Sequence, residues 1–292
     1  MINLRTNIIR QLLVSLVYYK INSRPYQTSS ITAVYLLSSS DVNRCIASLL
    51  SMMLATNSYV NPVFISDGSL KVEDTSFLKR VFKESVIYSQ QDLLHMIAKS
   101  REIDNSKLEL FATCKNIYLY KILAIIALKE RNIVVIDSDV LFINSFPSFH
   151  NLFSDSRLSY YSTYSDEVKN KLDKSQHMTG FILKKTLAEQ LKVKVDPYLV
   201  ASFFSVRLTD LQAKLFLEKI QLIDTFQLDF KHLDEFLLSF LSNKEFALDP
   251  DKYLNLVPGI SESVNTKPIF VHFAGTLKKS FWKFFIRNVL IM

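Results

Sequence analysis

Asp137 and Asp139 stand two residues apart, directly after the four apolar residues Ile133 to Ile136. Residues i and i+2 of an extended chain point to the same side, so the two carboxylates are expected to project together from the end of a buried strand. Two neighbouring negative charges repel each other unless a positive charge lies between them. Because Mg²⁺ and Mn²⁺ prefer oxygen ligands and share them with phosphates, the pair predicts a divalent-cation site.

The Asp-x-Asp pattern alone is weak, because a tripeptide recurs by chance. Asp249-Pro250-Asp251 is a second copy, and no buried strand is expected before it. The buried strand before the first copy is the feature that favours a site there.

The segment His272-Phe273-Ala274-Gly275-Thr276-Leu277-Lys278 carries a second set of suitable groups. A neutral imidazole can complete a metal site, and glycine lets the backbone approach an anion. A lysine adds a positive charge beside a phosphate. The alternative is a histidine at the end of a strand, followed by a solvated lysine turn.

These two segments resemble the signature motifs of the GT-A-fold nucleotide-sugar glycosyltransferases. NIVVIDSDVLFI, residues 132 to 143, resembles the apolar strand and DxD motif, and residues 272 to 278 resemble the family's C-terminal H-x-x-G-x-x-K. The resemblance is greatest to the retaining type that includes glycogenin and bacterial lipooligosaccharide galactosyltransferases. The family usually continues with Pro-Trp, whereas Lys279-Ser280 follows here.

The resemblance implies roles for these residues. Asp139 and His272 would bind the metal, and Asp137 would bridge metal and ribose, with Ser138 also at the donor. Gly275 and Lys278 would hold the diphosphate of the donor.

Two further segments resemble family motifs beside the sugar. Thr179-Gly180 precedes an expected strand at Phe181 to Lys184, but Met178 replaces the family's asparagine, and Thr179 would contact the sugar. Asp234-Glu235 resembles a D-Q pair, with Glu235 in place of the glutamine near the reacting carbon. Capping of a helix N-terminus is the alternative for this acidic pair.

Strand ends and one lysine supply the remaining candidates for the donor site. Ligands of parallel α/β sheets bind at the carboxyl ends of strands, which nominates the ends of the first two strands for the base and ribose. Lys121, sixteen residues before Asp137, occupies about the place of a family basic residue, although a solvated helix lysine fits equally well. The strand-end residues are Leu37, Ser38, Asp41 and Asp67.

The order of elements predicts an α/β fold with a GT-A-like (Rossmann-like), mostly parallel sheet flanked by helices. Apolar β-rich runs alternate with helical patterns along most of the chain, as in βαβ units. A weak strand is expected at 86–88, helices at 118–129 and 233–241, a strand at 269–273, and a helical or loop region at 186–225. We divide the chain into an N-terminal helical extension at 1–27, treated as an appendage, a single domain at 28–278 and a tail at 279–292.

Composition narrows the classes of function. The chain has 292 residues, 49% of them hydrophobic, so it can bury a sizeable core. With 2 cysteines and no Cys-x-x-Cys pair, neither a disulfide framework nor a zinc motif is expected, which favours a reducing cytoplasm. The apolar stretch at 8–19 is too short and too interrupted to span a membrane or to be a secretory signal.

The net charge of +7 favours an anionic partner, but no nucleic-acid recognition motif accompanies it. The C-terminal run KKSFWKFFIRNVLIM mixes basic and aromatic residues, as peripheral membrane segments do. One interpretation is that this segment binds the inner face of a membrane. A helix packed on the domain is the alternative.

The resemblance implies a retaining, metal-dependent hexosyltransferase that uses Mn²⁺ or Mg²⁺ and a nucleoside-diphosphate sugar, most simply a UDP-sugar, with a glycan or glycolipid acceptor. One alternative is a haloacid-dehalogenase-type phosphatase with Asp137 as nucleophile and Asp139 as acid. Another is a non-catalytic GT-A-like protein that binds sugar or serves as a scaffold.

Overall fold

The computed structural model describes residues 2–22, 27–99, 109, 111–146, 149–153, 160–174, 179–220, 232–242, 247–257 and 267–290. Every statement about structure below concerns this part of the chain.

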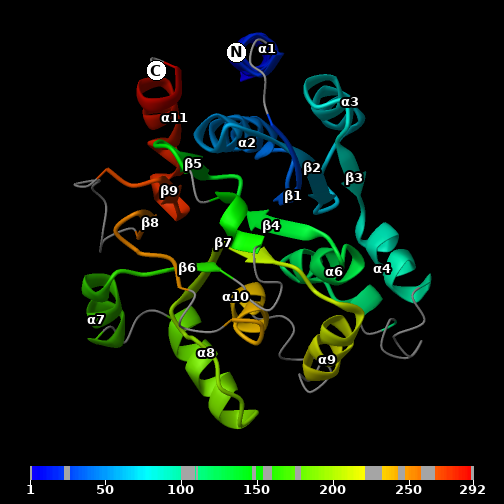
Figure 1. Cartoon of the computed structure of the whole chain (residues 1–292), viewed down its shortest axis with the longest axis vertical. Coiled ribbons are helices and arrows are strands. Elements are labelled where there is room, and N and C mark those ends of the chain that lie inside the picture. The colour runs from blue at the N-terminus through cyan, green and yellow to red at the C-terminus, as the bar shows by residue number, and fades with distance from the viewer. Residues whose placement is uncertain are drawn as a thin grey trace.

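A six-stranded sheet forms the centre of the molecule, in the order β3-β2-β1-β4-β7-β6 (Figure 1). The first four strands of this order run parallel, β7 is antiparallel to β4, and β6 is antiparallel to β7. The predicted class, a mostly parallel sheet flanked by helices, is confirmed. The strands are β1 (Gln27–Leu37), β2 (Ser58–Ser66), β3 (Val86–Tyr88), β4 (Asn132–Ile136), β6 (Tyr161–Thr163) and β7 (Leu199–Val206).

Helices cover both faces of this sheet, because its central strands are apolar on both sides. In β4, Val134 and Ile136 belong to one core cluster, and Ile133 and Val135 belong to the other. The first cluster includes α2 (Val42–Thr56) and α3 (Val72–Val81). The second includes α4 (Gln90–Lys99), α6 (Leu119–Ala127), α9 (Asp210–Ile220) and α10 (Leu233–Leu238).

A second sheet of three strands, β5-β9-β8, lies beside the first. Its strands are β5 (Val140–Phe142), β8 (Tyr253–Leu256) and β9 (Phe270–Phe273). β5 pairs antiparallel with β9, and Val140 lies opposite His272. This pairing brings together the two motifs that the sequence separates by more than a hundred residues.

The two ends of the described chain lie at the same end of the molecule (Figure 1). Helix α1 (Ile2–Asn22) buries Leu13 and Val17 in the first core cluster, so it packs on the domain. A 3₁₀ helix, η4 (Gly275–Lys279), leads into α11 (Phe281–Phe285) and the π-helical turn η5 (Ile286–Leu290). None of the described helices is long and apolar enough to cross a bilayer.

The strand expected at Phe181 to Lys184 is wrong. Residues Thr179–Gln190 form helix α8, because the apolar run continues into the helix-favouring segment Lys184 to Gln190. The strand of this region is β7, which lies within 186–225, where helix or loop was expected. All eight of its residues are buried, so its sequence, LVASFFSV, lacks the alternation of a half-exposed strand.

Candidate metal and diphosphate site

Three donor atoms converge at the junction of the two sheets. Nε2 of His272 lies 3.3 Å from Oδ1 of Asp139 and 3.8 Å from Oδ2 of Asp137. One ligand atom from each residue falls within 4.8 Å of the others. The predicted trio therefore meets in the fold, as a metal site made by two carboxylates and an imidazole requires.

The backbone fixes this convergence. Asp137 follows the last residue of β4, and its N–H donates to the carbonyl of Ser202 at 3.0 Å. The chain then turns, with the N–H of Val140 donating to the carbonyl of Asp137 at 3.2 Å. The N–H of Phe273 donates to the carbonyl of Asp139 at 3.0 Å, which ties the turn to β9. Ser138 is buried between the two acids.

A buried amide orients the ring of His272. Oδ1 of Asn255 lies 3.2 Å from Nδ1 of His272 and accepts a second hydrogen bond from Ser202 at 2.7 Å. Nδ2 of Asn255 donates to the carbonyl of Thr163 at 2.9 Å, which fixes the amide. Because an amide oxygen only accepts, Nδ1 of His272 donates, and Nε2 faces the carboxylates.

Two lysines occupy the other oxygens of the two aspartates. Nζ of Lys121 lies 2.6 Å from Oδ1 of Asp137, and Nζ of Lys278 lies 2.9 Å from Oδ2 of Asp139. Each aspartate thus has one oxygen on a lysine and the other toward His272. The lysines offset the negative charge of the acids and leave one oxygen of each for a cation.

Electrostatics agrees with this arrangement. Burial would raise the pKa of Asp139, but His272 and Lys278 outweigh burial and hold it well below its usual range. Burial would lower the pKa of His272, but the attraction of Asp139 outweighs it and raises that pKa. Asp139 is therefore ionised at neutral pH, and a cation at the site would compete with a proton on His272.

The chemistry of the donor set fits a hard divalent cation. Two carboxylate oxygens and one imidazole nitrogen suit Mg²⁺ or Mn²⁺, and the trio includes no thiolate. The site is mostly buried, with Asp139 4% and His272 8% exposed, so the charges are poorly screened by water.

Asp234 and Glu235 lie in the first turn of α10 and are paired with buried lysines. Oδ2 of Asp234 lies 2.9 Å from Nζ of Lys121, so this lysine bridges Asp234 and Asp137. Oε2 of Glu235 lies 2.8 Å from Nζ of Lys184 and 3.2 Å from Nδ1 of His232. The side chain of the N-cap residue, His232, makes no capping hydrogen bond. Oδ1 of Asp234 accepts the backbone N–H of Glu235 at 3.0 Å.

The two acids of this pair have opposite pKa shifts. Burial raises the pKa of Asp234 against the attraction of Lys121. Burial would raise the pKa of Glu235 as well, but Lys184 and His232 lower it to about 2. Glu235 is therefore a buried carboxylate held ionised by its neighbours.

The ends of the first two strands lie side by side at the same edge of the sheet. The N–H of Asp67 donates to the carbonyl of Leu37 at 3.0 Å. The Ser38 hydroxyl donates to Asp41 at 2.7 Å. Burial would lower the pKa of Lys278, but the attraction of Asp139 outweighs burial and raises it. The charge of Asp41 adds to this increase, and Asp41 therefore acts on Lys278.

The remaining nominated residues are glycines and a threonine. Gly275 has φ +55°, in the left-handed region that favours glycine, and begins the turn that carries Lys278. Thr179 and Gly180 form the start of α8, not the turn before a strand. The side chain of Thr179 lies outside the described residues.

Asn255 and Lys184 were absent from the sequence-based candidates. Asn255 interrupts the otherwise apolar run Tyr253 to Leu256, and a lone amide in such a run is a usable signal of a buried polar contact. No comparable signal marks Lys184, because its partner Glu235 lies fifty-one residues away in another helix.

Comparison with known proteins identifies the fold but finds no similar sequence. No protein-family model and no curated protein matches the sequence. The WbbM bifunctional glycosyltransferase matches 91% of this chain with a TM-score of 0.51 and 13% identity, and the match covers 51% of WbbM. Mouse xyloside xylosyltransferase 1 matches 85% of this chain and 98% of its own with a TM-score of 0.52 and 10% identity.

The galactosyltransferase LgtC, solved with donor and acceptor sugar analogues, is also similar, with 12% identity, a TM-score of 0.45, and coverage of 88% of this chain and 96% of its own. The first two similarities define the architecture. The chain has the GT-A fold of the nucleotide-sugar glycosyltransferases, and it spans about half the length of WbbM.

Proposed function

We propose that this chain is a metal-dependent glycosyltransferase that moves a hexose from a nucleoside-diphosphate sugar, UDP-linked in the simplest case, to a glycan or lipid-linked acceptor. The observation that carries the proposal is the convergence of Asp137, Asp139 and His272, with Lys278 beside them. This convergence lies in a fold shared with two solved glycosyltransferases. In this proposal residues 28–278 form the catalytic domain.

Asp137, Asp139 and His272 would hold Mn²⁺ or Mg²⁺. When bound, the cation would neutralise charge that develops on the departing diphosphate. The raised pKa of Lys278 keeps it protonated, so that it can bind a phosphate oxygen. Gly275 would let the backbone come close to the same phosphates.

The base and ribose would bind along Leu37, Ser38, Asp41 and Asp67, next to the metal trio. Lys121 would position Asp137 and Asp234 together, because its ammonium contacts both carboxylates. Asp234 and Thr179 would contact the sugar.

We further propose retention of configuration by front-face attack, with the departing phosphate taking the acceptor's proton. A double displacement with Glu235 as nucleophile is the competing mechanism. The contacts of Glu235 with Lys184 and His232 favour a positioning role, since a carboxylate in a buried ion pair is a poor nucleophile. Glu235→Gln should abolish transfer if Glu235 is the nucleophile, and should leave measurable transfer if attack is front-face.

The test is release of nucleotide from a panel of nucleoside-diphosphate sugars, with Mn²⁺ and with a chelator. We expect the wild-type chain to hydrolyse one donor slowly, and only when metal is present. The Asp139→Asn variant should not hydrolyse it. Asp249→Asn in the exposed second Asp-x-Asp is the matched control and should behave as wild type. Metal-dependent nucleotide binding without any turnover would instead indicate a non-catalytic sugar-binding protein. Full turnover by Asp139→Asn would refute the site.

A further inference from the structure

The positive charge of the chain is concentrated in its two terminal segments. Residues 1–27 contain four lysines and arginines and no acid, and residues 275–292 contain another four and no acid. Without these eight, 27 of the 35 basic residues remain against 28 acidic residues. The excess charge of the protein is therefore a property of these two segments.

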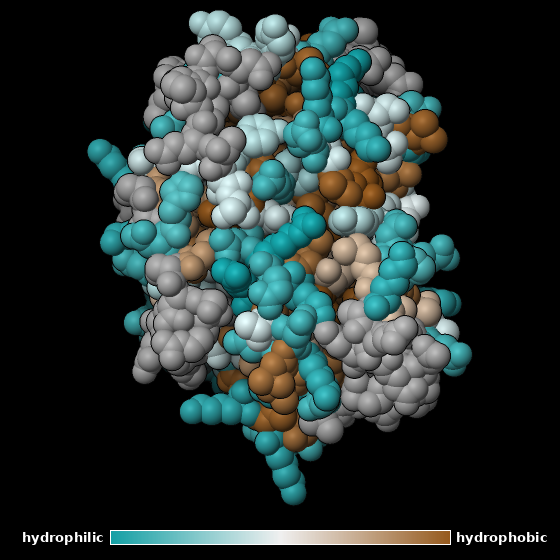
Figure 2. Space-filling model, turned by 45° about the vertical axis from the view of Figure 1, so that its right-hand side comes forward, coloured by the Kyte–Doolittle hydropathy of each residue, from teal (hydrophilic) through white to brown (hydrophobic). Residues whose placement is uncertain are grey.

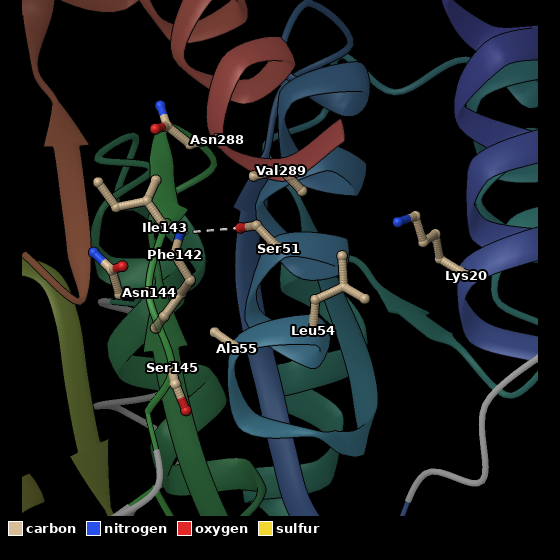
Figure 3. A pocket seen from close by; sticks show the side chains of 10 residues that line it. All are labelled: Lys20, Ser51, Leu54, Ala55, Phe142, Ile143, Asn144, Ser145, Asn288 and Val289. Atoms are coloured by element: carbon tan, nitrogen blue, oxygen red, sulfur yellow. Dashed lines mark hydrogen bonds between the residues drawn. The ribbon is translucent and has the colours of Figure 1, made fainter. Parts of the chain in front are cut away.

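Both segments lie at one end of the molecule, on either side of α2 (Figure 1). A cavity of about 250 Å³ separates them, and its lining includes Lys20 of α1, Leu54 of α2 and Val289 of η5 (Figure 3). The lining includes none of the candidate metal ligands. The terminal helices thus border one shared hollow.

The C-terminal helix has two distinct faces. Phe281, Phe285 and Val289 recur every four residues and are buried at 0%, 2% and 5% exposure. Lys279, Lys283, Arg287 and the half-exposed Ile286 form the opposite, outward face. The inner face packs on the domain, which agrees with the interpretation of this segment as a packed helix. The outer face carries the basic residues and one apolar residue.

Helix α1 exposes several large hydrophobic side chains on its outward face, beside the polar Gln11 and Ser15. Leu13 and Val17 point into the core, whereas Ile8, Leu12 and Tyr19 are 49%, 57% and 71% exposed. Within the described ranges, nine large hydrophobic side chains are exposed, and five of them lie on α1 or η5. Figure 2 shows brown and teal side chains mixed over the upper part of the molecule, at the end where α1 lies in Figure 1.

We propose that this end of the protein docks on an anionic lipid bilayer. Its terminal surface consists of Ile8, Leu12, Tyr18, Tyr19, Lys279, Lys283, Ile286 and Arg287. Exposed apolar and aromatic side chains insert at the headgroup boundary, and lysine and arginine are attracted to anionic headgroups. The absence of any acid from both segments removes the repulsion that such a surface would otherwise meet.

The terminal surface adjoins the candidate site. Lys278 contacts Asp139, and the next residue, Lys279, is exposed on the outward face. Docking would therefore hold the site beside the bilayer, which fits a lipid-linked acceptor. This last step rests on the proposed function, whereas the docking itself does not.

Co-sedimentation with vesicles tests the docking. One set contains phosphatidylcholine alone, and in the other one third of the lipid is phosphatidylglycerol. We expect the full chain to bind the anionic vesicles at low salt, to bind neutral vesicles much more weakly, and to be partly released as salt rises.

Two variants locate the surface. The triple variant Lys279→Glu, Lys283→Glu, Arg287→Glu should weaken binding on the order of a hundredfold or more. Its control is Lys115→Glu, Lys194→Glu, Lys214→Glu, which changes net charge equally at exposed sites elsewhere. Ile8→Ser with Leu12→Ser should weaken binding on the order of tenfold. Its control is Leu211→Ser with Leu215→Ser on α9, where both residues are also exposed.

Circular dichroism melts of all four variants separate loss of docking from loss of folding. The proposal is overturned if the wild-type chain does not bind anionic vesicles, or if the control variants lose as much binding as the surface variants. It is also overturned if the chain is a dimer that Ile8→Ser with Leu12→Ser dissociates, because the face would then be a protein interface. Metal-dependent donor hydrolysis is measured separately, so either proposal can fail alone.

Discussion

Asn255 holds the imidazole of His272 so that Nε2 points at Asp137 and Asp139. Its Oδ1 lies 3.2 Å from Nδ1 of His272, and its own amide is anchored at Ser202 and at the carbonyl of Thr163. β8 and β9 pair in parallel with Asn255 opposite His272, so the two side chains emerge at the same level of the second sheet. Asn255 therefore acts through His272 as a positioning residue.

Replacing Asn255 with leucine should weaken Mn²⁺ binding by about 10- to 100-fold, the usual effect of losing an outer partner of a metal-bound histidine. Ser202→Ala removes one neighbour of the amide but keeps Asn255, so a smaller loss is expected. Isothermal titration with Mn²⁺ measures both.

A second readout separates positioning from general damage. In metal-free protein, at a pH high enough to make the ring neutral, ¹⁵N spectra should show the His272 proton on Nδ1 in the wild type and a shifted tautomer balance in Asn255→Leu. The signal is assigned by its absence from His272→Ala. Unchanged metal affinity together with an unchanged tautomer would contradict the role of Asn255.

Lys121 neutralises two acids that would otherwise face each other. It is 3% exposed and contacts both Asp137 and Asp234. Lys121→Met should lower the free energy of unfolding by about 3–5 kcal/mol in metal-free buffer, because it leaves the buried carboxylate of Asp234 without a counter-charge. Saturating Mn²⁺ should restore part of this loss.

The control is Lys129→Met, which breaks an ion pair with Asp210 whose side chain is 71% exposed. Such surface pairs contribute about 0–1 kcal/mol, so urea unfolding should show little change. Equal losses in the two variants would sink the assigned role of Lys121.

The meeting of Asp137, Asp139 and His272 was predictable because each of them carries a local signal. A run of four apolar residues before an acidic pair marks a buried strand and its tip, and His272 follows another apolar strand. The parallel sheet was predictable for the same reason, since strands buried on both faces are apolar throughout. The short strands β5, β6 and β8 were missed, although β3 and β9, which are of similar length, were expected at 86–88 and 269–273.

The error at α8 and β7 has a physical cause. Phe181 to Leu183 is apolar in either structure, so only the helix-favouring residues after it decide the outcome. Lys121 and Lys278 were among the sequence-based candidates, but Lys184 was not, because its ion pair with Glu235 depends on which helices pack together. No local pattern records that information.

Phe203 joins the two sheets behind the site. It is fully buried in β7, and its ring lies 5.4 Å from that of Phe270 in β9 and 6.3 Å from that of Phe142 in β5. Phe203→Ala should lower the free energy of unfolding by about 3–5 kcal/mol, through lost burial and the cavity left behind. Urea unfolding measures the loss, and Phe203→Leu, which keeps most of the volume, should lose clearly less. Equal stability of the alanine variant and wild type would mean that the ring does not bridge the sheets.

The ion pair of Glu235 with Lys184 predicts a specific pH dependence of stability. The pKa of Glu235 is about 2 in the folded protein, against an ordinary value of 4.5. A lowered carboxyl pKa stabilises the fold above pH 4.5, and this stabilisation disappears as pH falls from 4.5 toward 2.

Glu235→Gln should therefore lower the free energy of unfolding by about 3 kcal/mol at neutral pH, because Lys184 remains buried without a counter-charge. The difference between wild type and variant should shrink as pH falls below 4.5. Glu167→Gln is the control, since the ion pair of Glu167 with Lys171 is exposed and screened by water, and it should change stability little at any pH. Urea unfolding of the three proteins between pH 7 and pH 3 measures these differences. A gap that stays constant or widens below pH 4.5 would show that Glu235 is not held ionised by its neighbours.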